Sequence, residues 1–588
     1  MNALLKFFNI CLLALVTIGF SSLFSSVFVN TKLLLFIFGF LVLIVGLIYK
    51  FIFNKTIQFN KFDNKSIYIS LILMGLFLIY GVFISINPIM SVFGTFERGL
   101  GVFVFFVLMI LFILNICFLK KSDLLHLILG ILVVNMVLCL YGVFQYLGID
   151  PFFKYYDTGL FHGRIFSFLG NPSFFAQFIA ICLPLNLVTF KQYRKFSVFS
   201  CLISICALVL TLTRSSILAV ICGIFILIFK TFPKYFIRFA IATVLLFSIL
   251  ALFVPRFNPN NVEALNSLNS RFVTWNATVN LIQQNPWGSG VASFASVFPS
   301  VIKPDIALYE DGTHVIIDNP HNQVLGVLSN FGWVGLVFYL SFVVFVLYRF
   351  FYSNNLLSTS LSLALIINLL QNQLNFFDLA SLLLCVCLFS YLIIDTFRYS
   401  EKNMIKSKFL PILSSILCLF FCGLVFVKIL FANIYYSEFV HFYKYDKDFA
   451  LNSLRLAANN AAFYDHFLMD LYEHDNESFE TQLEFWNYYD KASPRGEFYR
   501  SQLYKQMDLS RSRMILEQLV VKNPSNYMWI RSFADVLYKT GEYDLSKKYY
   551  LDFLEMFPVL ESDSSKKLKY FYSKSPEFNY VRKRIIEL

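Results

Sequence analysis

Long apolar stretches recur along this chain, and they constrain its fold more than any other feature. Thirteen runs are long enough to cross ~30 Å of hydrocarbon as helices. Hydrophobic residues make up 58% of the chain and charged residues only 14%, which excludes a soluble globular protein. The sequence therefore predicts an all-α, polytopic membrane protein of about 12–13 transmembrane helices. The runs are 9–29, 33–50, 66–87, 101–118, 123–147, 171–190, 196–213, 215–230, 236–254, 323–348, 356–374, 377–396 and 409–431.

Basic residues between these runs predict the orientation of the protein. Lysine-rich connections such as 119–122 and 191–195 are typical of the cytoplasmic side and place the N-terminus inside. The first run has no clear small-residue cleavage site, so we expect a retained helix and not a signal peptide. With thirteen spans, the C-terminal segment lies outside. The net charge of +12 is then mostly a topology signal, and we expect no nucleic-acid partner.

Composition divides the chain into four parts. We predict N-terminal transmembrane helices at 1–90 and a membrane region at 91–396 that contains a long extracytoplasmic loop at about 255–322, called the long loop below. An extra transmembrane helix is expected at 409–431, and a charged, aromatic and helical domain at 432–588. The eleven cysteines lie mostly in the apolar runs without metal-ligand spacing, so we expect no disulfide framework, metal site or cofactor.

The C-terminal domain carries a repeat signal. The segment 524–558 has the 34-residue period and helix–turn–helix pattern of a tetratricopeptide repeat. The stretches 447–480 and 497–522 look like degenerate copies, which neighbouring helices must complete into a small solenoid. The matching positions are Ala534, Gly541, Tyr543, Ser546, Tyr550, Leu554 and Pro558. The domain is either a docking surface for a protein or glycan, or a structural cap that stiffens the extracytoplasmic loops.

Arginine dominates the basic residues of the predicted outer side. By the topology above, that side carries Arg98, Arg164, Arg214, Arg256 and Arg271, but only three lysines, Lys32, Lys154 and Lys303. The positive-inside rule disfavours such residues there. Arginine presents a planar fork of donors that matches phosphate oxygens. The pattern indicates an anionic, phosphate-bearing ligand at the outer membrane face.

Short motifs follow one another through the membrane region and the long loop. They are Gly170-Asn171-Pro172, an R-x-x-x-L unit formed by Arg214 and Leu218, the segments 270–275 and 285–290, and His321-Asn322 followed after nine residues by Gly332-Trp333-Val334-Gly335. In this order they resemble the bacterial O-antigen ligase superfamily, which includes O-antigen ligases, O-antigen polymerases and protein O-oligosaccharyltransferases. The resemblance covers roughly residues 90–395.

The resemblance implies transfer of a glycan from an undecaprenyl-pyrophosphate carrier to a lipid, glycan or protein acceptor at the outer face of the cytoplasmic membrane. The reaction would be inverting and would need neither metal nor nucleotide. His321 matches the motif histidine and is expected to act as general base, since a neutral imidazole can accept a proton near neutral pH. Arg214 and Arg271 match the two motif arginines, and Arg164 is a third expected donor to pyrophosphate or glycan.

Three further residues are expected to support the site. Asp318 lies three residues before His321, where a carboxylate can orient the imidazole, and Asn322 belongs to the same motif. Arg98 has Glu97 beside it, so it either supports the ligand or positions its own loop.

Two other classes of protein compete with this interpretation. Buried polar residues such as Asn135, Gln145 and Asn368 would fit a transporter, but we find no pair of related halves, which transporters often have. A structural scaffold would leave the outer arginines without a role. Within glycan transfer, the sequence leaves ligase, polymerase and protein glycosylation open. The extra span and the C-terminal domain leave the acceptor open too, although lipid-A core is the usual acceptor of a ligase.

Overall fold

The fold is taken from a computed structural model, which describes most of the chain. The described residues are 1–24, 26–53, 58–153, 163–235, 262–304, 317–404, 409–461, 494–557 and 576–588, with single positions at 237 and between 467 and 478. They separate into two compact units, whose boundaries among the described residues fall within α3 (Ser66–Phe83), α4 (Pro88–Phe93) and α15 (Gln323–Tyr352). Apart from position 237, the predicted span 236–254 lies outside the described residues, as does Arg256.

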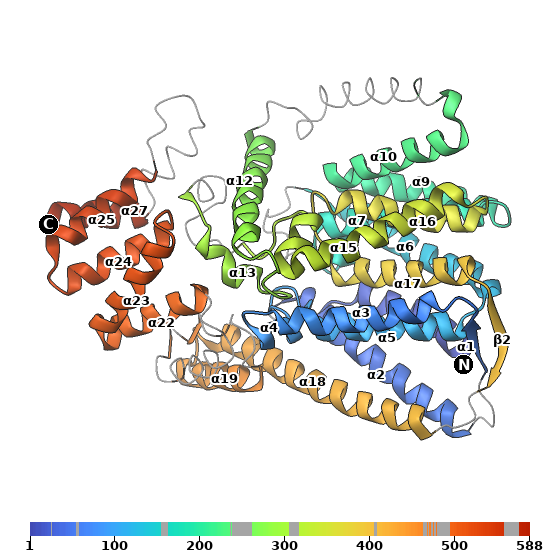
Figure 1. The fold of residues 1–588 in the computed structure, drawn as a ribbon, viewed down its shortest axis with the longest axis horizontal. Coiled ribbons are helices and arrows are strands. Elements are labelled where there is room, and N and C mark those ends of the chain that lie inside the picture. The colour runs from blue at the N-terminus through green and yellow to red at the C-terminus, as the bar shows by residue number, and fades with distance from the viewer. Residues whose placement is uncertain are drawn as a thin grey trace. The chain divides into compact units, whose positions relative to one another are not determined.

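The first unit comprises Met1–Tyr80, Phe93–Leu246 and Val337–Tyr464, and it is a bundle of apolar helices (Figure 1). Besides the parts of α3 and α15 that it contains, its longer helices are α1 (Asn2–Ile18), α2 (Val29–Phe53), α5 (Val102–Phe118), α6 (Leu124–Tyr146), α7 (Pro172–Cys182), α9 (Arg194–Leu210), α10 (Arg214–Thr231), α16 (Leu356–Gln371), α17 (Leu379–Thr396), α18 (Phe409–Phe442) and α19 (Lys447–Asn460). Short helices are η1 (Lys121–Asp123), η2 (Ser167–Leu169), η3 (Leu183–Leu185), α8 (Asn186–Thr189) and η4 (Pro233–Tyr235).

The predicted membrane fold is confirmed. Eight helices among the described residues are long and apolar enough to cross a membrane, and α1, α5 and α16 are shorter apolar helices. The first helix differs from the expected 9–29, since it ends at Ile18 before Gly19. The apolar residues that follow leave the helix, and their rings pack on other loops. Phe20, for example, lies 4.8 Å from Phe153 between ring centroids.

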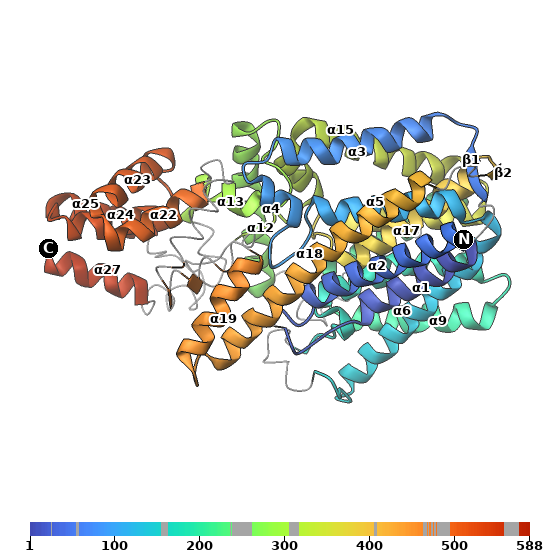
Figure 2. The ribbon, with the colours of Figure 1, turned by 90° about the horizontal axis from the view of Figure 1, so that it is seen from below.

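Two features of this unit were not visible in the sequence. A small antiparallel sheet pairs β1 (Gln58–Phe62) with β2 (Tyr399–Met404), and so joins two connections that are far apart in the chain. Helix α18 packs along α2, as both views of the ribbon show (Figures 1 and 2). The extra apolar run near the C-terminus is therefore part of the same bundle.

Buried polar side chains in the bundle bond to one another across helices. Asn135 donates to the Ser204 hydroxyl at 2.8 Å, and Gln177 donates to the Asn368 carbonyl oxygen at 2.9 Å. Such interhelical hydrogen bonds hold membrane helices together where the lipid offers no partner. The Asn135 and Asn368 side chains, which had suggested a transport path, thus take part in packing.

The second unit comprises Gly81–Val92, Phe247–Leu336 and Asp465–Leu588. Its elements are α4 (Pro88–Phe93), α12 (Val262–Gln284), α13 (Phe294–Val297), η6 (Phe298–Ser300), the start of α15, α22 (Pro494–Met507), α23 (Leu509–Lys522), α24 (Tyr527–Lys539), α25 (Tyr543–Glu555) and α27 (Pro576–Glu587). In the expected helix–turn–helix segment, α24 and α25 form a pair. The Ser546 hydroxyl donates to the Ala534 carbonyl at 2.9 Å, so small residues let these helices approach closely.

One hydrophobic core joins the long loop to the C-terminal helices. Ala277 and Phe298 of the loop belong to the same buried cluster as Trp529 and Phe533 of α24. Polar bonds accompany this contact, since the Asn526 side-chain amide donates to the Pro299 carbonyl at 2.8 Å. The C-terminal helices therefore fold together with the long loop.

Candidate active site

Two of the predicted arginines meet at one turn of the first unit. The Arg164 guanidinium donates to the Thr211 carbonyl and to the Thr213 hydroxyl, both at 2.8 Å. Thr213 is the N-cap of α10, and Arg214 is the first residue of that helix. Arg164 is thus fixed beside the R-x-x-x-L unit. A helix N-terminus carries partial positive charge and unpaired backbone N–H groups, so two guanidinium groups there favour an anion.

The Gly-Asn-Pro turn is built into the same place. The Asn171 side chain accepts from the Ser173 N–H at 2.8 Å and caps α7, while Pro172 occupies the first helical position. The Pro172 carbonyl accepts from the Thr213 hydroxyl at 3.3 Å. The start of α7 is therefore bonded to the residue that precedes Arg214.

In the second unit, His321 lies in a tight turn before α15. Its backbone N–H donates to the Asn319 side-chain oxygen at 2.8 Å, and the Trp275 indole N–H donates to the Pro320 carbonyl at 2.8 Å. Asn322 caps α15, since its side-chain oxygen accepts from the Leu325 N–H at 3.0 Å. The capping residue of the His-Asn pair is therefore the asparagine, and the histidine is half-buried just outside the helix.

The motifs at 285–290 and 332–335 contact each other through their backbones. Helix α15 is interrupted at Gly332, where φ is 60° and ψ is −154°. The interruption leaves the Ser329 and Asn330 carbonyls without their usual helical donors, and the N–H groups of Ser289 and Gly290 bond to them at 2.9 Å. A Cβ on Gly332 would lie 2.3 Å from the Pro286 carbonyl oxygen. Glycine is needed at 332 for both its torsion angles and this close approach.

Backbone strain gathers in the same motifs. Four non-glycine residues in the described part of the chain have positive φ, namely Ser167, Leu212, Ala292 and His321. Each lies in or beside a motif that the sequence analysis singled out. A non-glycine residue in this region costs about 1–3 kcal/mol and persists where the surroundings impose it, often at functional sites. The distribution supports these turns as the functional part of the molecule.

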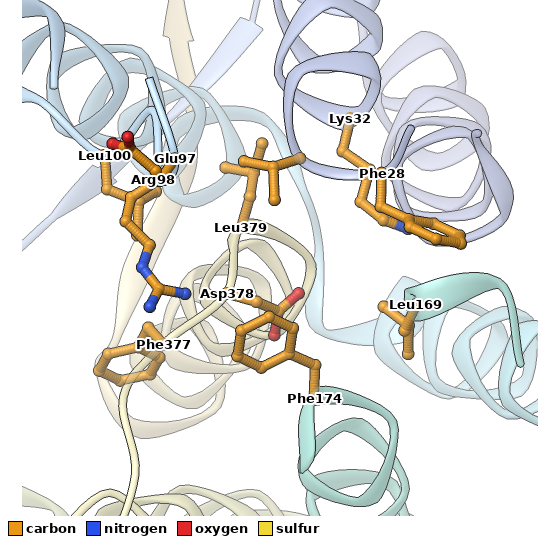
Figure 3. Close-up of a pocket in the computed structure, with 11 residues that line it drawn as sticks. Phe28, Lys32, Glu97, Arg98, Leu100, Leu169, Phe174, Phe377, Asp378 and Leu379 are labelled. Atoms are coloured by element: carbon orange, nitrogen blue, oxygen red, sulfur yellow. The ribbon is translucent and has the colours of Figure 1, made fainter. Parts of the chain in front are cut away.

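A pocket in the first unit places Arg98 with two charged residues, Lys32 and Asp378, that the sequence analysis did not assign to the site. Figure 3 shows Lys32, Arg98 and Asp378 around it, together with the rings of Phe174 and Phe377. Arg98 also lies over the Phe376 ring, 4.0 Å from its centroid. Lys32 had a signal in the sequence, as one of three lysines on the predicted outer side, whereas Asp378 lies in none of the motifs named from the sequence.

The predicted site residues fall into two sets. Arg98, Arg164 and Arg214 belong to the first unit, whereas Arg271, Asp318, His321 and Asn322 belong to the second. Within the second set, Arg271 lies in α12 one turn before Trp275, whose indole is bonded to the His321 turn. The catalytic and binding roles of all seven residues stay predictions.

Comparison with known proteins supports the same class. Residues 199–340 match the family described as O-antigen ligase, a segment that includes Arg214, Arg271 and His321. The match supports the O-antigen ligase superfamily, whose members are glycan-transferring enzymes of the ligase and polymerase type. Searches of curated proteins and of solved structures gave no significant match.

Proposed function

We propose that this protein transfers a glycan from an undecaprenyl-pyrophosphate carrier to an acceptor hydroxyl at the outer face of the cytoplasmic membrane. The observation that carries the proposal is the family match over 199–340, since it covers Arg214 next to a strained turn, Arg271 in α12, and His321 in a strained turn. Arg164, fixed beside Arg214 at the start of α10, adds a second guanidinium for a diphosphate. The acceptor is a lipid, a glycan or a protein, and membrane lipids surround the bundle.

The proposed reaction follows from the chemistry of these groups. His321 takes the proton of the acceptor hydroxyl, and the oxygen attacks the anomeric carbon of the donor sugar. The bond from that carbon to the pyrophosphate oxygen breaks, and the electron pair leaves with undecaprenyl pyrophosphate. Arg164 and Arg214, with Arg271 from the long loop, stabilise the charge that develops on the leaving group. Attack opposite the leaving group inverts the anomeric centre.

The proposal is tested with purified protein and a lipid-linked glycan. His321→Ala is expected to abolish transfer while the donor still binds, because the arginines remain. His126→Ala is the matched control, since it removes an exposed imidazole of α6 that lies outside the motifs. A His321→Ala variant that transfers glycan at the wild-type rate would make the histidine a structural turn residue.

Ligase and polymerase activities differ in what accumulates when the protein is missing. Loss of a ligase leaves long undecaprenyl-linked chains unattached, whereas loss of a polymerase leaves single lipid-linked repeat units. Loss of a protein glycosylation enzyme leaves unmodified acceptor proteins. We propose the ligase, and in the C-terminal helices a tetratricopeptide-like extracytoplasmic domain that can dock a protein partner. Analysis of surface polysaccharide and glycoproteins from a deletion strain separates the three activities.

A further inference from the structure

The pocket beside Asp378 has polar groups of both signs and aromatic walls. Its charged lining residues are Lys32, Glu97, Arg98 and Asp378, two basic and two acidic. A diphosphate bound there would lie against carboxylates, which disfavours it. A sugar ring, by contrast, offers hydroxyl groups that both donate and accept, and apolar C–H faces that fit aromatic rings such as Phe174.

Of the four charged side chains, Asp378 and Arg98 are suited to hold such a ligand. The Lys32 ammonium is buried and donates to the Thr17 and Phe168 carbonyls at 3.2 and 2.7 Å, so it fixes the bundle. The Asp378 carboxylate accepts one backbone N–H on each oxygen, from Ala380 and Ser381, at the start of α17. Each carboxylate oxygen has a second lone pair, so Asp378 can still accept hydroxyl hydrogen bonds. Figure 3 shows the Arg98 guanidinium reaching toward the Asp378 side of the pocket.

The pocket and the arginine pair share the first turn of α7. The Pro172 carbonyl is bonded to Thr213, next to Arg214, while Phe174, two residues further on, lines the pocket. If Arg164 and Arg214 hold the diphosphate of a ligand, this pocket lies in the same region of the first unit as that diphosphate.

We propose that the pocket is the subsite for the donor sugar attached directly to the pyrophosphate, with Asp378 and Arg98 binding its hydroxyl groups. This inference rests on the proposed function and names the part of the donor that sets specificity. The Asp378 carboxylate accepts from the sugar, and the Phe174 ring lies against a C–H face.

The test compares binding of two kinds of probe to the full chain in lipid nanodiscs. One probe is undecaprenyl pyrophosphate alone, and the others carry glucose, galactose or N-acetylglucosamine on the diphosphate. At least one sugar-bearing probe is expected to bind the wild type more tightly than the bare carrier. Asp378→Asn keeps a capping oxygen for α17 but removes the charge. This substitution is expected to weaken the binding of that probe about tenfold and to leave the affinity for the bare carrier unchanged.

Two further variants make the result decisive. Asp446→Asn removes the same charge from the capping residue of α19 and is expected to change neither affinity. Phe174→Leu keeps the pocket wall apolar but removes the ring, and it is expected to weaken only the sugar-bearing probe. If Asp378→Asn does not fold, Phe174→Leu still tests the subsite.

Several outcomes would overturn the inference. If Asp378→Asn weakens the binding of both kinds of probe equally, the carboxylate has a structural role. If Asp378→Asn raises only the KM for the acceptor, the pocket binds the acceptor and not the donor sugar. Absence of any preference for the three sugars in the wild type would also reject the subsite. If the wild type does not bind even the bare carrier, the proposed function itself fails.

Discussion

Replacing Gly332 by alanine tests whether the backbone contact between the two loop motifs holds the His321 turn. Alanine at φ 60° and ψ −154° occupies a region that only glycine adopts readily, at a cost of about 1–3 kcal/mol. The new Cβ would also lie 2.3 Å from the Pro286 oxygen, so the two backbones must separate. That separation would weaken the bond from the Trp333 N–H to Pro286, worth about 1 kcal/mol.

We expect Gly332→Ala to lose about 3 kcal/mol of stability in this unit. Hydrogen exchange should rise at Ser289 and Gly290, whose N–H groups bond to the interrupted helix, and glycan transfer should fall. The measurements are exchange by mass spectrometry, thermal unfolding in nanodiscs, and transfer to acceptor at equal protein abundance.

Gly326→Ala is the matched control on the same helix. A Cβ at Gly326 meets only the Pro320 ring, at the ordinary contact distance of 3.8 Å, and its φ is not positive. This substitution should be neutral or stabilise the helix by up to about 1 kcal/mol. If Gly332→Ala proves as stable and active as Gly326→Ala, the backbone contact does not position the site.

Three other predictions address the arginines, the topology and the C-terminal helices. Arg214→Lys keeps the charge but loses the planar fork, so it should cost about 2–4 kcal/mol of transition-state stabilisation in a transfer assay; Arg194→Lys is the control, and equal rates would make Arg214 a generic cation. A reporter active only outside the cytoplasm should work after Leu588 and be silent in the loop 191–195; the reverse pattern would contradict the thirteen-span topology. Asn526→Ser keeps a cap for α24 but loses the bond to Pro299, so exchange at 294–302 should rise about fivefold; unchanged exchange would separate the C-terminal helices from the long loop.

The helices and the motif turns follow from local sequence. Apolar runs predict the bundle because backbone groups in lipid must bond within their own segment, which favours helices. The cap at Asn171 and the glycine at 332 are local signals too, since each depends on the torsion angles of one or two residues. Their contacts are not local. The pairing of Gly332 with Pro286 joins residues far apart in the chain, so the sequence showed the motif but not its partner.

The pocket residues and the shared core show where prediction from one sequence stops. Asp378 and Lys32 are far apart in the chain and come together only through the packing of α2 against the other helices, which no periodicity encodes. The core of the second unit has the same origin. Apolar positions of the long loop, such as Ala277 and Phe298, need a partner surface, and α24 supplies it with Trp529 and Phe533. The loop that carries His321 is therefore stabilised by residues more than 200 positions later, which makes the C-terminal helices part of its support whatever partner they dock.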